Sequence, residues 1–338
     1  MQLLSFKSLL ATAAALACAA VAAQEQVVKI GHSGPLSGPN TFAGRDNDNG
    51  VRLAIEELNA RKISVGGKTL KFELVSEDDQ CDAKTGVAVA QKFVDSGVRY
   101  VMGPYCSGVT IPASRVYDNG GTLVSTVGTN PKITQSGYKN LFRIVASDVQ
   151  AGASMAAYAA NVLKAKKVGV IDDRTAFGQG LADEFAKEAQ KLGMTVAGRE
   201  FTNDKATDFM AILTTFKAKQ PEAIFYGGYA PQAAPMARQM KQLGVRAKLL
   251  GGDTLCSPEM GKLGGDAVND VVYCAYAGML MDSDAGAKAF QEKFAKRFGQ
   301  NPDVYSPFYY DQVINIGEAM QKSGSIDPAK VGAYIQQN

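Results

Sequence analysis

The sequence predicts an α/β fold in two similar lobes, each built on a doubly wound, mostly parallel sheet. Apolar runs of strand length alternate with longer helical patterns to the end of the chain. A weak internal repeat relates residues 27–31, with the polar loop and helix after them, to residues 167–171 and their own loop and helix. The chain has 338 residues, 46% of them hydrophobic, which is more than one hydrophobic core usually holds.

The strands are predicted where apolar runs of strand length alternate with longer helical patterns, which is typical of mostly parallel sheets. They span residues 27–33, 70–76, 100–103, 122–126, 167–172, 195–201, 223–227, 248–251 and 271–275.

The helices are predicted between these strands, where apolar residues recur on one face. In the first helix Leu53, Ile55 and Leu58 share a face, and Glu56 and Glu57 lie largely on the other. The predicted helices span residues 44–60, 83–96, 107–118, 149–165, 178–192, 207–219, 231–243, 285–298 and 306–323.

The first 23 residues are interpreted as a cleavable signal peptide. Lys7 precedes an apolar stretch too short to span a bilayer, which ends in small residues before Gln24. Lipidation of Cys18 is disfavoured, because Ala15 stands where a bulky residue is preferred. We expect a secreted protein with residues 24–147 in lobe I, 148–276 in lobe II, and 277–338 back in lobe I. Short crossovers are expected near residues 143–148 and 273–278, with Asp148 as a helix N-cap.

Composition and charge exclude several classes of function. A net charge of +3 is too balanced for a nucleic-acid footprint or a polybasic membrane patch. His32 is the single histidine, interpreted as a loop hydrogen-bonding residue, so we expect no metal, no cofactor and no Ser-His-Asp triad. The sequence Gly67-Lys68-Thr69 is not a phosphate loop, because Lys62 stands where a glycine is required, and it is interpreted as a turn.

Four cysteines remain after the signal peptide, namely Cys81, Cys106, Cys256 and Cys274. An even number in an oxidising compartment predicts disulfides, and the absence of C-x-x-C argues against zinc or dithiol chemistry. Three pairings are possible. We favour Cys81 with Cys106 and Cys256 with Cys274, because each pair closes a local loop and contributes roughly 3 kcal/mol.

Polar residues follow several predicted strands at their carboxyl ends, where ligands bind in open α/β sheets. Ser107 opens a helix whose free N–H groups suit an anion, and Thr129 follows the next strand. Tyr229 and Asp253 follow two strands of the second lobe. Donors for an anion on one lobe and a carboxylate on the other suit a zwitterion, although an ordinary N-cap and tight turns explain the same residues.

Five motifs together carry a family resemblance. They are residues 30–39 (IGHSGPLSGP), 78–82 (DDQCD), 103–107 (GPYCS), 129–131 (TNP) and 226–229 (YGGY). The chain resembles the periplasmic branched-chain amino-acid-binding proteins of ABC transporters from the signal peptide to its end. The resemblance implies the type I periplasmic-binding-protein fold, with two lobes that close on an amino acid about a three-stranded hinge.

The resemblance also implies roles for single residues. Ser107 and the Thr129 amide would hold the α-carboxylate, and the Thr129 hydroxyl and the Val127 carbonyl would accept from the α-ammonium. Tyr229 and Asp253 would reach across from lobe II, Asp253 as partner of the ammonium. The side-chain pocket would consist of Phe177, Tyr105 and Ala43. Cys81 with Cys106 matches the family disulfide.

We therefore expect a monomeric solute receptor that binds a branched-chain amino acid (leucine, isoleucine or valine) and delivers it to an inner-membrane ABC permease. The alternative ligand is an amide, urea or an aromatic acid, because Asp253 is shorter than the family's glutamate and Ala43 replaces a bulkier residue. An enzyme is not expected, since neither Ser107 nor Tyr229 has an identifiable base. Family members continue past the helix at residues 331–337 with further strands, so the chain is expected to be a fragment.

Overall fold

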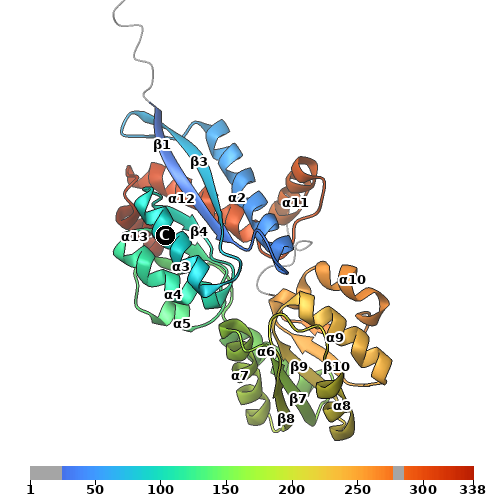
Figure 1. Cartoon of the computed structure of the whole chain (residues 1–338). Helices are drawn as coiled ribbons and strands as arrows, with labels where there is room; N and C mark the ends of the chain where they lie inside the picture. Colours follow the sequence, from blue (N-terminus) through green and yellow to red (C-terminus); the bar gives the residue numbers. More distant parts are fainter. Residues whose placement is uncertain (1–24, 277–284) are drawn as a thin grey trace, which may run out of the picture.

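The computed structural model describes residues 25–276 and 285–338. Two parallel-stranded sheets lie in two halves of the molecule (Figure 1). The predicted signal peptide, Cys18, and the first residues of the predicted return to lobe I lie outside the described residues. None of the helices within the described ranges combines the length and the apolar character needed to cross a membrane.

The first sheet has six strands in the order β2-β3-β1-β4-β5-β6, and all pairs except β2 with β3 are parallel. A side chain would not fit at Gly103, just after β4, because its Cβ would collide with the Ser33 carbonyl and its φ is +112°. The strands are β1 (Glu25–Gly34), β2 (Ser64–Val65), β3 (Lys68–Asp78), β4 (Tyr100–Met102), β5 (Leu123–Thr126) and β6 (Leu141–Arg143).

The second sheet has five parallel strands in the order β11-β10-β9-β7-β8. Apart from β2, the two sheets share one topology, because β3-β1-β4-β5-β6 corresponds strand by strand to β8-β7-β9-β10-β11. The internal repeat of the sequence reflects this shared topology. The strands are β7 (Lys167–Asp172), β8 (Thr195–Phe201), β9 (Ala223–Gly227), β10 (Lys248–Gly251) and β11 (Val272–Cys274).

The helices flank both sheets. Those of the first half are α2 (Thr41–Arg61), α3 (Ala83–Asp95), α4 (Ser107–Asn119), α5 (Lys132–Gln135), α11 (Ala285–Phe298), α12 (Ser306–Ser323) and α13 (Pro328–Gln337). Those of the second half are α6 (Asp148–Asn161), α7 (Ala176–Lys191), α8 (Met210–Lys219), α9 (Ala230–Leu243) and α10 (Glu259–Gly264), with the 3-10 turns η1 (Asp253–Cys256) and η2 (Gly265–Ala267).

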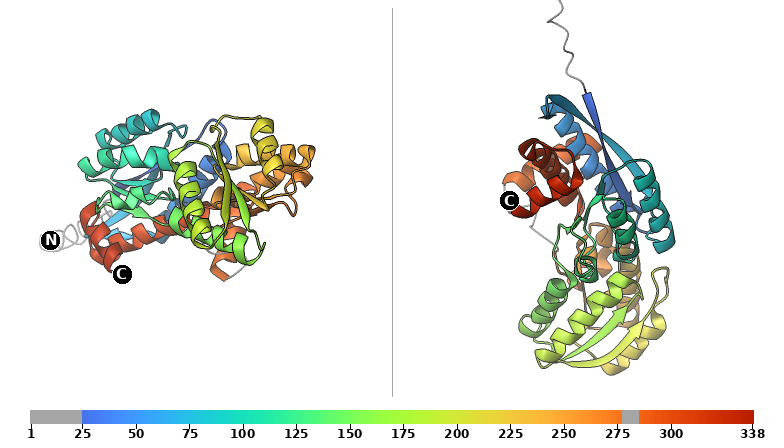
Figure 2. Two further views of the ribbon diagram at one scale, coloured as in Figure 1. Left: turned by 90° about the horizontal axis from the view of Figure 1, so that it is seen from below. Right: turned by 90° about the vertical axis from the view of Figure 1, so that its left-hand side faces the viewer.

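The C-terminal helices return to the first half of the molecule. Helix α12 packs against α2, and α13 packs against α12 and β5. The side view shows the two halves stacked, with these helices on the half that holds β1 (Figure 2). The chain leaves β6 at Arg143 and enters α6 at Asp148, which is the first crossover between the halves. The exact lobe boundaries stay predictions.

The α/β prediction is confirmed, and four of the predicted strands, β7 to β10, have the predicted bounds. Two short strands, β2 and β6, are not among the predicted elements. Gly66 and Gly67, both at positive φ, form the turn between β2 and β3, in agreement with the rejection of a phosphate loop. Asp148 is not the N-cap of α6. Ser147 is the cap and forms a capping box with Gln150, so Asp148 is the first helical residue.

The core of the second half holds α7 closely against the sheet. The Phe185 ring stacks on the Phe225 ring at 4.1 Å between centroids. A Cβ on Gly227 would collide with the Gly178 carbonyl, so these glycines let β9 and α7 approach each other. Close packing, rather than approach of a backbone to a ligand, therefore explains glycine at position 227.

Candidate functional site

One side of the candidate site is the N-terminus of α4, directly after β4. Ser107 is the first helical residue and is 1% exposed. Its hydroxyl oxygen accepts a hydrogen bond from the Asn130 backbone N–H at 3.3 Å, which joins the helix start to the loop after β5. The first N–H groups of a helix have no carbonyl partner within it and bind anions. This end of the first sheet therefore offers donors suited to a carboxylate.

The loop after β5 links this helix start to the second half of the molecule. The Thr129 carbonyl accepts from the Asp148 backbone N–H at 3.0 Å, and Thr129 is buried. The Val127 backbone N–H donates to the Tyr309 hydroxyl at 3.4 Å, and Val127 is buried as well. Thr129 therefore lies next to Asn130, whose backbone N–H contacts Ser107, and close to the point where the chain crosses between the halves.

The second half contributes the carboxylate of Asp253, the first residue of η1 after β10. Asp253 is 2% exposed, and its Oδ1 accepts from the Thr254 backbone N–H at 3.1 Å. Burial raises the pKa of Asp253 to about 6, although a hydrogen bond from the Tyr305 hydroxyl opposes this shift. A buried carboxylate without a cation favours a proton or a positively charged ligand.

Asp148 is a second buried carboxylate of the site, which the sequence interpretation missed. Both of its oxygens are buried without a donor in good hydrogen-bond geometry. Burial raises the pKa of Asp148 to about 8, and the charge of Asp253 acts in the same direction, while Thr129 and Arg143 lower the pKa only in part. Asp148 and Asp253 are therefore two buried carboxyl groups whose ionised forms a ligand's ammonium group would stabilise.

Aromatic rings from both halves line the site. Phe177 of α7 lies 5.1 Å from Tyr229, the N-cap of α9, and Tyr229 lies 6.0 Å from Tyr105 of the first half, measured between ring centroids. Tyr305, which precedes α12, lies 5.6 Å from Tyr105 in an edge-to-face arrangement. Of these four rings Tyr305 was not predicted. The wall they form is apolar on its ring faces and suits a hydrocarbon side chain.

Ala43 of α2 lies beside this wall. It lines a cavity of about 10 Å³ together with Tyr105 and Tyr305. The other lining residues come from both halves and are Phe42, Asn47, Thr254, Ser257, Asp303 and Val304. The predicted pocket residues Ala43, Tyr105 and Phe177 thus lie around a common group of tyrosines.

Direct hydrogen bonds join the two halves around the site. The Asn130 side-chain amide donates to the Ala176 carbonyl at the start of α7, at 2.7 Å. The Ser257 hydroxyl donates to the Asp303 carboxylate of the first half at 2.7 Å. Within the first half, the Asp303 backbone N–H donates to the Asp46 carboxylate at 3.0 Å. Burial raises the pKa of Asp46 to about 7. The described conformation is therefore one in which the two halves are in contact.

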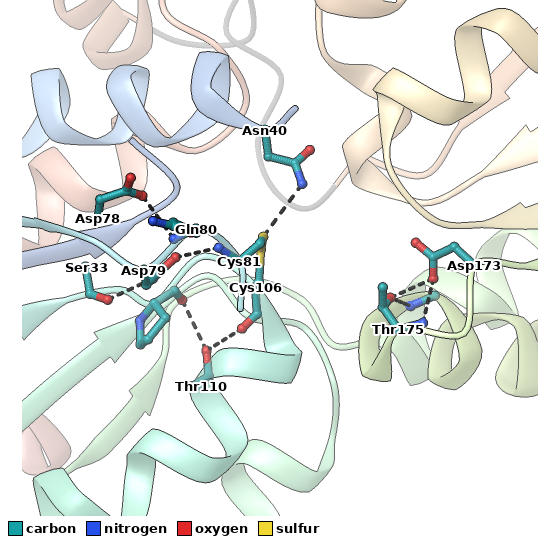
Figure 3. The surroundings of a disulfide bond; sticks show 12 residues. Ser33, Asn40, Asp78, Asp79, Gln80, Cys81, Cys106, Thr110, Asp173 and Thr175 are labelled. Carbon is teal, nitrogen blue, oxygen red and sulfur yellow. Dashed lines mark hydrogen bonds between the residues drawn. A yellow bond between two sulfur atoms is a disulfide. The ribbon is translucent and has the colours of Figure 1, made fainter. Parts of the chain in front are cut away.

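A disulfide between Cys81 and Cys106 fixes the start of α4 (Figure 3). It links the loop after β3 to the N-cap of α4, and its Cα atoms are 5.5 Å apart. The Cys81 backbone N–H donates to Asp79 at 3.0 Å, and Asp79 accepts from the Ser33 hydroxyl at 2.8 Å. The Thr110 hydroxyl donates to the Cys106 carbonyl at 3.1 Å. The second predicted pair, Cys256 and Cys274, is also bonded and closes the segment after Asp253.

His32 lies apart from this group. It is fully buried in β1, and its Nδ1 is 3.3 Å from the Asp48 carboxylate, so it is a strand residue and not the loop residue that the sequence suggested. Asp48 also accepts from Arg52 at 2.9 Å. Within residues 25–276 and 285–338, no cluster of three or more His, Cys, Asp or Glu side chains could hold a metal ion.

The geometry as a whole suits reversible capture of a small zwitterion. Ser107 and the first turn of α4 present donors, Asp148 and Asp253 present acceptors, and aromatic rings form a wall beside them. Charge-assisted hydrogen bonds to both ends of such a ligand would each contribute about 1.5–3 kcal/mol.

Comparison with protein families gives a match to the periplasmic binding protein family over residues 27–337. Among curated proteins, an amino acid binding protein of Pseudomonas aeruginosa is 36% identical over 91% of this chain and 82% of its own length. A Leu/Ile/Val-binding protein homolog of Brucella abortus is 35% identical, over 92% of this chain and 82% of its own.

Solved structures resemble this chain over most of its length. The leucine binding protein LivK of Thermotoga maritima aligns with a TM-score of 0.83 and 29% identity, over 91% of this chain and 87% of that chain. A substrate-binding protein of Desulfitobacterium hafniense, solved in complex with Leu, aligns with a TM-score of 0.73 and 26% identity, over 92% and 89% of the two chains. The fold is therefore the two-lobed fold that the sequence resemblance implied.

Proposed function

The chain belongs to the periplasmic binding protein family, and we propose that it is the receptor of an ABC importer that captures an amino acid between two lobes. In this proposal the carboxylate of the amino acid lies at the N-terminus of α4, and its ammonium lies between Asp148 and Asp253. The chain binds and releases its ligand without chemical change and delivers it to a membrane permease.

One observation carries this proposal. Two buried carboxylates, with pKa values raised to about 6 and about 8, lie across the lobe junction from a helix N-terminus that presents free donors. No ion pair involves either carboxylate among the described residues. A ligand that carries an ammonium and a carboxylate neutralises both features at once, whereas a neutral amide or an aromatic acid neutralises at most one.

We further propose that the ligand is a branched-chain amino acid. The ring faces of Phe177 and Tyr229 offer an apolar wall, and no buried cation in the described part of this wall would favour an acidic side chain. The names of the relatives, which bind leucine, isoleucine and valine, support the same ligand class. Residues 1–23 are proposed to direct export to the periplasm, where the partner is an inner-membrane permease and the receptor is a monomer.

Substitution of Ser107 by alanine tests the carboxylate side of this site. We expect Ser107→Ala to weaken leucine, isoleucine and valine binding about 10- to 100-fold, because one charge-assisted hydrogen bond to the ligand is lost. Isothermal titration calorimetry measures the change, and mass spectrometry of the copurified ligand identifies the natural amino acid.

The matched control is Ser114→Ala on the same helix, whose hydroxyl bonds the Thr110 carbonyl at 2.6 Å, seven residues away from the helix start. The control should keep the wild-type affinity. Equal affinity of Ser107→Ala and the wild-type protein would contradict the site, and copurification of an amide or an aromatic acid would contradict the ligand class.

Closure without ligand is expected to depend on pH. In the described conformation burial raises the pKa of Asp253 to about 6 and that of Asp148 to about 8. The two carboxylates therefore bind protons more tightly in the closed form than in an open form with a hydrated cleft. Lowering the pH from 8 to 5 should therefore favour the closed form of the ligand-free protein, because protons replace the missing ammonium. Small-angle X-ray scattering reports this as a smaller radius of gyration. A radius that grows on acidification, while ligand-bound protein stays compact, would contradict it.

A further inference from the structure

The N-terminal ends of the strands of the second sheet lie on the side of this half that faces away from the first half (Figure 1). Basic residues are numerous in the segments at these strand ends, and we name this group the basic end. Its members come from the turn before β7 and from β7, from the end of α8, and from the start of β10. They are Lys164, Lys166, Lys167, Lys217, Lys219, Arg246 and Lys248. The net charge of +3 for the whole chain gave no sign of this cluster, because the clustering is spatial.

The cations of the basic end have no carboxylate partner. None of the seven forms an ion pair with a described residue, whereas Lys187, Lys191 and Arg199 of the same half are each paired with an acid. The Lys167 ammonium donates to the Lys219 backbone carbonyl at 3.2 Å, and neither side chain's charge is neutralised by that contact. The cluster therefore carries a net positive charge, which Glu222 offsets only in part.

A hollow of about 830 Å³ opens in the middle of the basic end. Lys217, Arg246 and Lys248 line it together with the apolar side chains of Leu163 and Phe216. Glu222, the one acidic residue in the lining, accepts from the Lys167 backbone N–H at 2.8 Å. The hollow thus combines cations with an apolar surface.

Exposed aliphatic side chains adjoin the charges. Val162, next to Leu163, is 60% exposed, and Leu192, which ends α7 near the start of β8, is 41% exposed. Lysine and arginine around exposed aliphatic groups are typical of surfaces that lie on anionic membranes, where cations contact headgroups and apolar side chains enter the interface. A nucleic acid or an acidic protein would account for the charges alone.

We propose that the basic end docks the protein on an anionic phospholipid surface, with a headgroup phosphate in the hollow. This goes beyond ligand capture, because the basic end lies at the opposite ends of the second-sheet strands from Tyr229 and Asp253. Docking therefore leaves the cleft free, and lipid and amino acid bind independently.

Vesicle flotation of the purified protein tests the proposal. We expect binding to vesicles of phosphatidylcholine with phosphatidylglycerol, loss of binding at high salt, and no binding to phosphatidylcholine alone. The variant Lys164→Gln, Lys217→Gln, Arg246→Gln should reduce the bound fraction at least about tenfold. The control variant Lys84→Gln, Lys139→Gln, Lys330→Gln removes three exposed lysines of the other half and should bind vesicles like the wild-type protein.

Three results would overturn the proposal. They are equal binding to neutral vesicles, equal losses in the two variants, and no binding to phosphatidylglycerol vesicles at low salt. Circular dichroism and the melting temperature check that the variants fold, and their amino-acid affinity should equal that of the wild-type protein. Because that affinity is measured separately, failure of lipid docking would leave the proposed amino-acid site untouched, and the reverse also holds.

Discussion

Replacing Asp253 by asparagine is expected to weaken amino-acid binding by about 100-fold, corresponding to roughly 3 kcal/mol. The substitution keeps the size of the side chain and removes the charge that would meet the ligand's ammonium in a site closed to water. Asp148 replaces it only in part, because burial raises its pKa to about 8, so at neutral pH the ammonium must displace a proton from Asp148 to pair with it. Calorimetry with leucine, isoleucine or valine measures the loss.

A ligand without the amine separates this effect from general damage. Isocaproate, which is leucine without its ammonium group, should bind Asp253→Asn at least as well as it binds the wild-type protein. The melting temperature should not fall, because the substitution removes a desolvated carboxylate. Asp118→Asn, on the exposed side of α4, is the matched control for loss of one charge. If leucine bound Asp253→Asn and the wild-type protein equally, Asp253 would not be the partner of the ammonium.

The sequence was informative about the site where a local rule decides position. Polar residues that directly follow parallel strands lie at one edge of the sheet, and this rule predicts the placement of Ser107, Thr129, Tyr229 and Asp253. The structure locates all four at the junction of the halves. Their roles in binding stay predictions until a ligand is measured.

The sequence was uninformative where position depends on contacts between distant segments. Tyr305 reaches Asp253 only because α12 returns the chain to the first half. No local sequence pattern around Tyr305 predicts this contact. The sequence predicts Asp148 as the helix cap, but Ser147 is the cap in the structure, where its backbone N–H donates to the Gln150 side chain. The strand β6 has three residues, too few for a periodic signal.

The same distinction applies to charge. The sequence predicts ion pairs between residues three or four apart on a helix, such as Lys187 with Glu184. In each such pair the two charges neutralise each other. The sequence does not show which cations remain unpaired, because Lys217 of α8 and Arg246 before β10 line one hollow only in the folded chain. A balanced net charge is therefore compatible with a strongly basic end.

Removal of the disulfide near the site, by Cys81→Ala with Cys106→Ala, is expected to lower the free energy of unfolding by roughly 3 kcal/mol. The bond closes a loop across 25 positions of the chain, so its loss increases the conformational freedom of the unfolded state. It also frees the N-cap of α4 from the loop after β3, and the donors for the ligand's carboxylate lose their fixed position. Denaturant unfolding measures the stability, and calorimetry at a temperature where the variant is folded measures the affinity.

The second disulfide provides the comparison that separates stability from binding. Cys256→Ala with Cys274→Ala opens a loop across 18 positions and should cost a similar free energy of unfolding. It leaves the start of α4 intact and loosens the segment after Asp253. Isocaproate, which uses only the carboxylate donors, should therefore bind the Cys256 and Cys274 variant normally and the Cys81 and Cys106 variant weakly. Equal isocaproate affinity in both variants would show that the first disulfide stabilises the fold without positioning the donors.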